Sequence, residues 1–132
     1  MKIMLDTNIL ISAMLFPNKE INATMAALFS DNEIYLSSYV VDELKYVVRR
    51  KFPSKINTVD KLLLKMNYIL SYTPDIIDES MFNIRDMKDY PVLYSAILEE
   101  VDILITGDKD FDDIDIDKPE IMSLAEYKNR YL

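Results

Sequence analysis

The stretch Ile103-Leu104-Ile105-Thr106-Gly107-Asp108-Lys109-Asp110-Phe111 decides how this chain folds. Residues 102–105 are predicted to form a short buried strand, which ends where the apolar run meets Gly107 and two acids. Gly107 is the only glycine in 132 residues, so we expect either a positive φ there or a close approach of another group to the main chain. An acid directly after a buried strand lies where α/β proteins place their chemistry, beyond the carboxyl ends of the strands. The alternative is an ordinary turn in which Asp108 caps the next segment.

The composition limits the chemistry that is open to the chain. With 132 residues, of which 50% are hydrophobic, it is predicted to form a single domain over residues 1–132. It has no apolar run of membrane-spanning length and no signal pattern at its N-terminus, so we expect a cytoplasmic protein with no membrane partner. It contains neither cysteine nor histidine, which excludes disulfides, thiolate sites and histidine chemistry. Any metal must therefore be bound by oxygen, as Mg²⁺, Mn²⁺ and Ca²⁺ are.

The net charge of −8 argues against a surface that coats nucleic acid, because phosphate contacts need clustered lysine and arginine. Local basic patches remain compatible with this charge, as does a cation that bridges acidic side chains to phosphate. A strongly acidic protein is also suited to capture by a basic partner.

Strand and helix patterns alternate along the chain, which predicts a parallel sheet with helices on both faces. The expected strands are residues 2–5, 33–36, 102–105 and 120–122, together with an edge strand at 72–77 that Pro74 interrupts. The expected helices are residues 9–16, 21–30, 40–51, 59–70, 90–98 and 124–131.

Acids also stand at two junctions between predicted elements. Asp6 follows the first strand, and with Thr7 and Asn8 it lies where the next helix begins. One interpretation is that Asp6 or Thr7 only caps that helix, and the other is that Asp6 supplies a carboxylate at the end of the sheet. Asp89 precedes a later helix and fits a capping residue by itself. Asp86 stands three residues before it, and two acids at the positive end of one helix are less typical of capping alone.

Glu43 lies on or beside the apolar stripe of the helix predicted at 40–51, three residues after Val40 and four before Val47. A buried carboxylate without a partner is costly or is neutralised by a shifted pKa. Glu43 is therefore either a site acid or a side chain that reaches water or pairs with a lysine or arginine. The same helix carries a basic cluster that either favours the helix C-terminus or binds phosphate next to the acid. Its members are Lys45, Arg49, Arg50 and Lys51.

If the fold brings these acids together, like charges a few Å apart raise each other's pKa values or push the site open. A divalent cation removes the repulsion, and carboxylates are its natural ligands. Mg²⁺ or Mn²⁺ held in this way can bind a phosphodiester oxygen, activate a water molecule and stabilise the leaving oxygen. The residues present therefore permit metal-assisted phosphodiester hydrolysis and exclude most rival reactions.

Four motifs, taken in order, resemble the PIN-domain family, and within it the small prokaryotic toxins of toxin–antitoxin pairs. They are Met4-Leu5-Asp6-Thr7-Asn8-Ile9-Leu10, Val41-Asp42-Glu43-Leu44, Asp86-Met87-Lys88-Asp89-Tyr90-Pro91-Val92-Leu93 and Leu104-Ile105-Thr106-Gly107-Asp108-Lys109-Asp110-Phe111. The resemblance implies a three-layer α/β/α fold around a central, mostly parallel sheet. It implies a nuclease that uses Mg²⁺ or Mn²⁺ to cleave single-stranded RNA, forms a homodimer and is silenced by a small antitoxin protein.

The resemblance also implies roles for individual residues, matched by position. The catalytic and metal-binding acids would be Asp6, Glu43, Asp89 and Asp108, with Asp86 and Asp110 as second choices. Supporting polar residues would be Thr7, Asn8 and Thr106, and RNA contacts are expected from Lys45, Arg49 and Arg50. Tyr90-Pro91 after Asp89 departs from the commonest pattern, so the third acid could shift or share its role with Asp86.

Two rival hypotheses remain at the level of sequence. The first is a PIN-fold module that binds metal or a protein and cuts nothing. The second is a receiver-like domain with Asp6 as phosphoacceptor, which is disfavoured because Thr7 and Asn8 follow Asp6 where a second acid is needed.

Overall fold

Five parallel strands form one sheet at the centre of the computed structural model, which describes all residues from Met1 to Leu132. The sheet order is β3-β2-β1-β4-β5. The strands are β1 (Lys2–Leu5), β2 (Glu33–Ser37), β3 (Ile69–Ser71), β4 (Ile103–Ile105) and β5 (Glu120–Met122). Every pairing is parallel, with Leu5 opposite Ile105 and Met4 opposite both Tyr35 and Leu104. All five strands therefore end at the same edge of the sheet.

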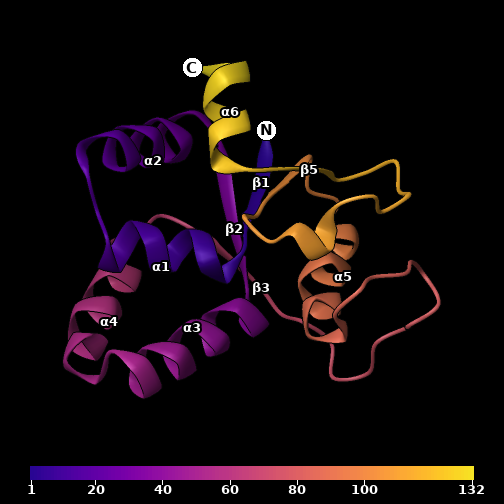
Figure 1. The fold of residues 1–132 in the computed structure, drawn as a ribbon, viewed down its shortest axis with the longest axis horizontal. Helices are drawn as coiled ribbons and strands as arrows, with labels where there is room; N and C mark the ends of the chain where they lie inside the picture. Colours follow the sequence, from indigo (N-terminus) through magenta and orange to yellow (C-terminus); the bar gives the residue numbers. More distant parts are fainter.

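The helices cover the sheet on both faces, as the alternating strand and helix patterns in the sequence predicted. They are α1 (Thr7–Leu15), α2 (Lys19–Asp31), α3 (Ser38–Lys51), α4 (Ile56–Lys65), α5 (Tyr90–Leu98) and α6 (Leu124–Tyr131). In Figure 1, α1 to α4 lie on the left, α5 lies on the right, and the strands run between the two groups. None of the helices combines the length and apolar character needed to cross a membrane.

The core is a single cluster of 28 buried hydrophobic residues. The central strands β1 and β4 are covered on both faces, so residues 3–5 and 103–105 are apolar without alternation, as in other buried parallel strands. Ile3, Met4, Leu5, Leu104 and Ile105 are all inaccessible to solvent. This burial fixes the ends of β1 and β4 relative to each other, and the first polar residues after them are Asp6 and Thr106.

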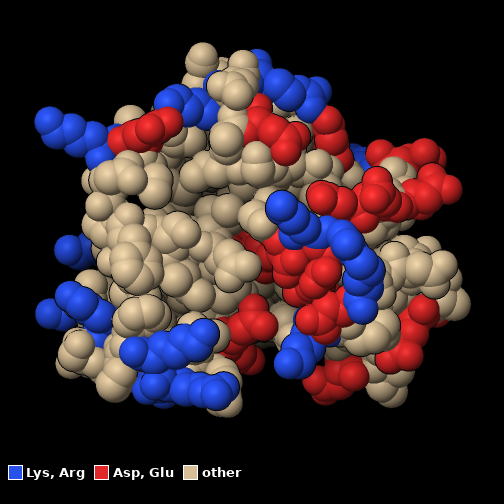
Figure 2. Space-filling model, in the orientation of Figure 1, with Lys and Arg blue, Asp and Glu red and all other residues tan.

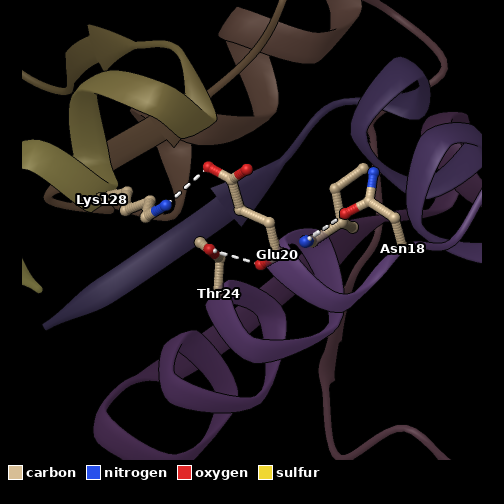
Figure 3. Close-up of polar contacts among 5 residues, drawn as sticks. Asn18, Glu20, Thr24 and Lys128 are labelled. Carbon is tan, nitrogen blue, oxygen red and sulfur yellow. Dashed lines mark hydrogen bonds and ion pairs between the residues drawn. The ribbon is translucent and has the colours of Figure 1, made fainter.

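Short polar contacts set where several helices begin. Asn18 caps α2 by accepting a hydrogen bond of 2.9 Å from Ile21 N–H, and Ser37 caps α3 by accepting one from Val40 N–H. Figure 3 shows this end of α2, where Thr24 also donates to the Glu20 carbonyl and the Glu20 carboxylate pairs with Lys128 of α6. The pair is exposed, so we regard it as a contact that orients α6 against α2 and not as a main source of stability.

The predicted boundaries are confirmed for the strands at 2–5 and 120–122 and for the helix at 124–131. The predicted helix at 59–70 is confirmed over residues 59–65 but extends too far, and the predicted edge strand at 72–77 is wrong. The helix ends at Lys65, and the edge strand is Ile69–Ser71, in which Leu70 pairs with Leu36 of β2. Pairing with β2 therefore overrides a helical pattern that the apolar residues alone would continue.

The expectation for Gly107 is also wrong. Its φ is not positive, and a Cβ atom placed on it would meet no other atom within 4 Å. Neither backbone conformation nor crowding requires glycine at this position.

Candidate functional site

Asp6 and Thr106 stand side by side at the carboxyl edge of the sheet, because each is the first residue after one of two neighbouring strands. The N–H of Asp6 donates to the Ile105 carbonyl at 3.0 Å, which extends the pairing of β1 and β4 by one residue. Asp6 is buried, with 4% of its surface exposed. The position of its carboxylate is therefore set by the sheet itself.

The Thr106 hydroxyl connects Asp6 to Asp108. It donates a hydrogen bond of 2.7 Å to Asp6 Oδ2 and accepts one of 3.1 Å from the main-chain N–H of Asp108. Asp6 Oδ1 accepts a further bond of 2.7 Å from Thr7 N–H, so Asp6 does cap α1. Oδ1 of Asp6 caps the helix, and Oδ2 accepts from Thr106. Asp6 can therefore cap α1 and also supply a carboxylate at the end of the sheet.

Glu43 reaches the same place from α3. Its Oε1 accepts a hydrogen bond of 2.5 Å from the Thr7 hydroxyl, and its side chain is half-buried. It forms no ion pair with lysine or arginine, so that interpretation of Glu43 is wrong. Thr7 and Thr106 thus each hold one acid of the predicted site. Asn8 does not: its side chain is exposed and makes no hydrogen bond.

Asp89 ends a single 3₁₀ turn, η2 (Met87–Asp89), that leads into α5. Asp86 caps this turn by accepting from Lys88 N–H at 3.0 Å, whereas the Asp89 side chain makes no capping bond. Its Oδ2 atom is buried and has no hydrogen-bond partner. Capping is therefore the structural role of Asp86, and the interpretation that Asp89 only caps α5 is wrong.

Burial raises the pKa of Asp89 to about 7, helped by the nearby charge of Asp108, a hydrogen bond shared with Asp108, and the charges of Asp6 and Asp86. Burial likewise raises the pKa of Asp6; hydrogen bonds from Thr106 and Thr7 oppose the rise, and the charges of Glu43 and Asp108 add to it. The predicted acids are thus close enough to repel one another.

The tightest group of carboxylates includes the two second-choice acids. Asp86, Asp89 and Asp110 each place an oxygen within 4.8 Å of the others. Asp110 sits on the 3₁₀ turn η3 (Lys109–Phe111), where its N–H donates to Asp108 Oδ1 at 2.8 Å. The two second-choice acids therefore lie beside Asp89, one of the four acids matched first, and their part in the site stays a prediction.

These carboxylates fit a hard divalent cation. The side-chain groups of the site are carboxylates and hydroxyls, and an unpartnered oxygen of Asp89 is buried among them. Burial, together with the neighbouring negative charges, raises the pKa values of Asp6 and Asp89. The one ion pair formed by a site acid is that of Asp110 Oδ1 with Arg85 Nε, at 3.7 Å. A cation would supply positive charge to the other acids, which have no lysine or arginine partner.

The predicted RNA-binding residues lie further along α3. Lys45 is half-buried, Arg49 and Arg50 are exposed in the last turn, and none of the three forms an ion pair. Figure 2 shows basic side chains gathered over α3, beside a group of acidic side chains at the centre of the same face. Their charges are therefore free to meet a polyanion that approaches the acids.

Two residues near the site were missed by sequence reasoning. Arg85 reaches η3, where it pairs with Asp110 and also donates to the Lys109 carbonyl. Tyr39 stands one helical turn before Glu43 and contacts η2. The four-residue spacing from Glu43 is the signal that could have identified Tyr39, because it places both side chains on one face of α3.

Comparison with known proteins adds a family and a fold. A family model described as a PIN domain matches residues 2–110. The crystal structure of VapBC2 from Rickettsia felis, bound to a DNA fragment from their promoter, is similar with a TM-score of 0.68 and 21% identity, covering 93% of this chain and 98% of that one. Mycobacterium tuberculosis VapC20, a sarcin-ricin loop cleaving toxin, is similar with a TM-score of 0.60 and 10% identity, covering 83% and 92%. No curated protein gave a significant match. At these identities the structural likeness concerns the fold.

Proposed function

The chain belongs to the PIN-domain family, and from this premise we propose that it is a metal-dependent endoribonuclease that cleaves single-stranded RNA as the toxin of a toxin–antitoxin pair. The observation that carries the proposal is the gathering of acids at the carboxyl edge of the sheet, with the unpartnered Oδ2 of Asp89 among them. Such a site is suited to a cation and, through it, to a phosphodiester.

Each residue has a separate task in this proposal. Asp6, Glu43, Asp89 and Asp108 hold Mg²⁺ or Mn²⁺, and Asp86 and Asp110 extend the same set of ligands. When bound, the cation supplies charge for the phosphate and makes water a better nucleophile. Thr106 and Thr7 keep their hydroxyl hydrogens directed at Asp6 and Glu43, so these two carboxylates present fixed lone pairs. Hydrolysis then forms one bond from water oxygen to phosphorus and breaks one P–O ester bond.

The basic side chains of α3 would guide the RNA. Lys45, Arg49 and Arg50 carry charge without a carboxylate partner, on the helix that also carries Glu43. A single strand held along α3 would deliver its backbone to the acids.

The structural neighbours support the biological part of the proposal. One of them is a toxin that cleaves the sarcin-ricin loop, and the other is VapBC2. We propose on this basis that an antitoxin protein is the partner of this chain, and by family resemblance that the chain forms a homodimer.

A cleavage time course on a pool of single-stranded RNA tests the proposal, run with Mg²⁺, with Mn²⁺ and with chelator. Wild type is compared with Asp6→Asn and with Asp31→Asn, a control that removes an exposed acid at the end of α2. We expect metal-dependent cleavage by wild type and Asp31→Asn and none by Asp6→Asn, with unchanged circular dichroism. Cleavage that persists in Asp6→Asn would refute the assignment.

A second candidate is a PIN-fold module that binds metal or protein without cutting RNA. The excess of acids favours it, since only Arg85 forms an ion pair with them. Robust metal-dependent cleavage by the purified protein would eliminate this module. The receiver-like alternative is disfavoured further, because both oxygens of Asp6 are already hydrogen-bonded and the side chain is buried.

A further inference from the structure

The hydroxyl of Tyr39 makes a direct link between the two elements that carry Glu43 and Asp89. It donates a hydrogen bond of 2.8 Å to the main-chain carbonyl of Lys88, 49 residues away along the chain. The ring is half-buried and packs against the core at the start of α3. The hydrogen bond itself is exposed to solvent, and the packing of the ring holds the hydroxyl between α3 and η2.

The Lys88 carbonyl belongs to the peptide group that leads into Asp89. The N–H of that same group donates to the Asp86 carbonyl at 3.0 Å. A peptide group is planar from one Cα atom to the next, so a hydrogen bond at each end fixes its orientation and the position of the Asp89 Cα atom, from which the carboxylate side chain branches. Tyr39 supplies one of these two bonds, and the other is local to η2.

The Asp89 side chain has one hydrogen-bond partner, the side chain of Asp108, and no main-chain group or hydroxyl holds it. It makes no capping bond, and its Oδ2 has no hydrogen-bond partner. Asp6 differs, because Thr7 N–H and the Thr106 hydroxyl hold both of its oxygens. Apart from its contact with Asp108, the carboxylate of Asp89 is thus oriented through its main chain.

We propose that Tyr39 is a positioning residue whose hydroxyl, by fixing the Lys88–Asp89 peptide, sets the Asp89 carboxylate relative to Glu43 for cation binding. This inference rests on the proposed function in one respect, the use of Asp89 as a metal ligand. Burial and the charges of Glu43, Asp89, Asp86 and Asp6 raise the pKa of Tyr39, so its hydroxyl keeps the proton that it donates.

The test removes the hydroxyl and keeps the ring. Mn²⁺ binding is measured by titration calorimetry for wild type, Tyr39→Phe and Tyr46→Phe. The last is the matched control, since Tyr46 lies on the same helix, is 61% exposed and makes no hydrogen bond. We expect Mn²⁺ affinity to fall about tenfold in Tyr39→Phe, as is typical when the partner that orients a metal ligand is lost. Tyr46→Phe should bind Mn²⁺ as wild type does.

RNA cleavage provides a second readout. Because Tyr39→Phe leaves the basic residues of α3 intact, we expect kcat to fall and KM for RNA to stay unchanged at a fixed Mn²⁺ concentration. Wild-type Mn²⁺ affinity in Tyr39→Phe would overturn the inference. A melting temperature lowered by more than about 5 °C would also overturn it, since that would indicate a role in general stability.

The two proposals fail in different ways. If wild type binds Mn²⁺ and cleaves no RNA, the nuclease function fails, and the comparison of Mn²⁺ affinities still decides the role of Tyr39. If wild type cleaves RNA and Tyr39→Phe matches it in affinity and kcat, the nuclease function stands and the role of Tyr39 is refuted.

Discussion

Replacement of Asp89 by asparagine should stabilise the metal-free protein at alkaline pH. Asp89 is the acid whose pKa rises to about 7, because it is partly buried and faces Asp108, Asp6 and Asp86. At pH 8 most of its carboxyl groups are ionised in the folded protein, next to other negative charges. Asparagine keeps the shape of the side chain and removes this charge, so the folded state no longer bears the repulsion.

The size of the effect follows from the pKa. A rise from 3.8 to about 7 is equivalent to about 4 kcal/mol of unfavourable ionisation in the folded state. Since the side chain is only partly buried and solvent screens its interactions, we expect about 1–2 kcal/mol to appear in the free energy of unfolding. For a chain of this length, that corresponds to a melting temperature about 4–7 °C higher in Asp89→Asn.

The pH dependence identifies the cause. The folded-state pKa lies above the unfolded value, so the folded protein binds the proton more tightly between pH 3.8 and about 7. Wild-type stability therefore falls as the pH rises through this window. The advantage of Asp89→Asn should be largest at pH 8 and about a third as large at pH 5.

Thermal unfolding at pH 5 and pH 8, in chelator, measures this difference. Asp112→Asn is the control, because Asp112 is an exposed acid just after η3 and its removal changes the net charge equally. Addition of Mg²⁺ at pH 8 should then stabilise wild type more than Asp89→Asn, because a cation stabilises the state that binds it. The reasoning is refuted if Asp89→Asn melts no higher than wild type at pH 8, or if its advantage is equal at both pH values.

Three further substitutions probe the surroundings of the site. Gly107→Ala should leave the melting temperature within about 2 °C of wild type, because φ is not positive and a Cβ atom has free space; a larger fall in thermal unfolding would contradict this. Thr106→Val should lower the free energy of unfolding in urea by about 1–3 kcal/mol, since Asp6 loses a buried hydrogen bond; an unchanged midpoint would argue against it. Joint replacement of Arg49 and Arg50 by glutamine, in the Asp6→Asn background, should reduce the salt dependence of RNA binding by about 1.4 in log–log slope. Fluorescence anisotropy measures that slope, and an unchanged value would remove both residues from the RNA path.

The parts of the fold that sequence predicted well are those set by burial. Lys2–Leu5 and Ile103–Ile105 are apolar runs that end at a polar residue, and in the structure they pair as neighbouring parallel strands. Their shared edge brings Asp6 next to Thr106, so these positions follow from topology alone. The parallel sheet and its helical layers were predictable for the same reason.

The remaining features depend on contacts that a local pattern does not contain. Ile69–Ser71 is a strand only because β2 offers an open edge beside it. Asp86 and Asp110 join Asp89 because η2 and η3, which lie far apart in sequence, approach each other in the fold. In the sequence, Tyr39 is an ordinary residue of an amphipathic helix. Its role becomes visible only in the fold, where its hydroxyl donates to the Lys88 carbonyl. These contacts belong to the tertiary structure, and the spacing of residues along one helix or strand cannot predict them.

The way in which the acids are held is itself an argument for cation binding. A fold selected only for stability would separate like charges or pair them with lysine and arginine, and this chain has both residues in its sequence. Here the Thr106 hydroxyl and the Thr7 N–H instead fix Asp6 where burial and neighbouring charges raise its pKa. Burial and neighbouring charges also raise the pKa of Asp89, and its Oδ2 atom has no hydrogen-bond partner. If a cation binds as proposed, it would offset the free energy that these constraints cost in the metal-free protein. Variants that relieve the repulsion should therefore gain stability and lose cation affinity.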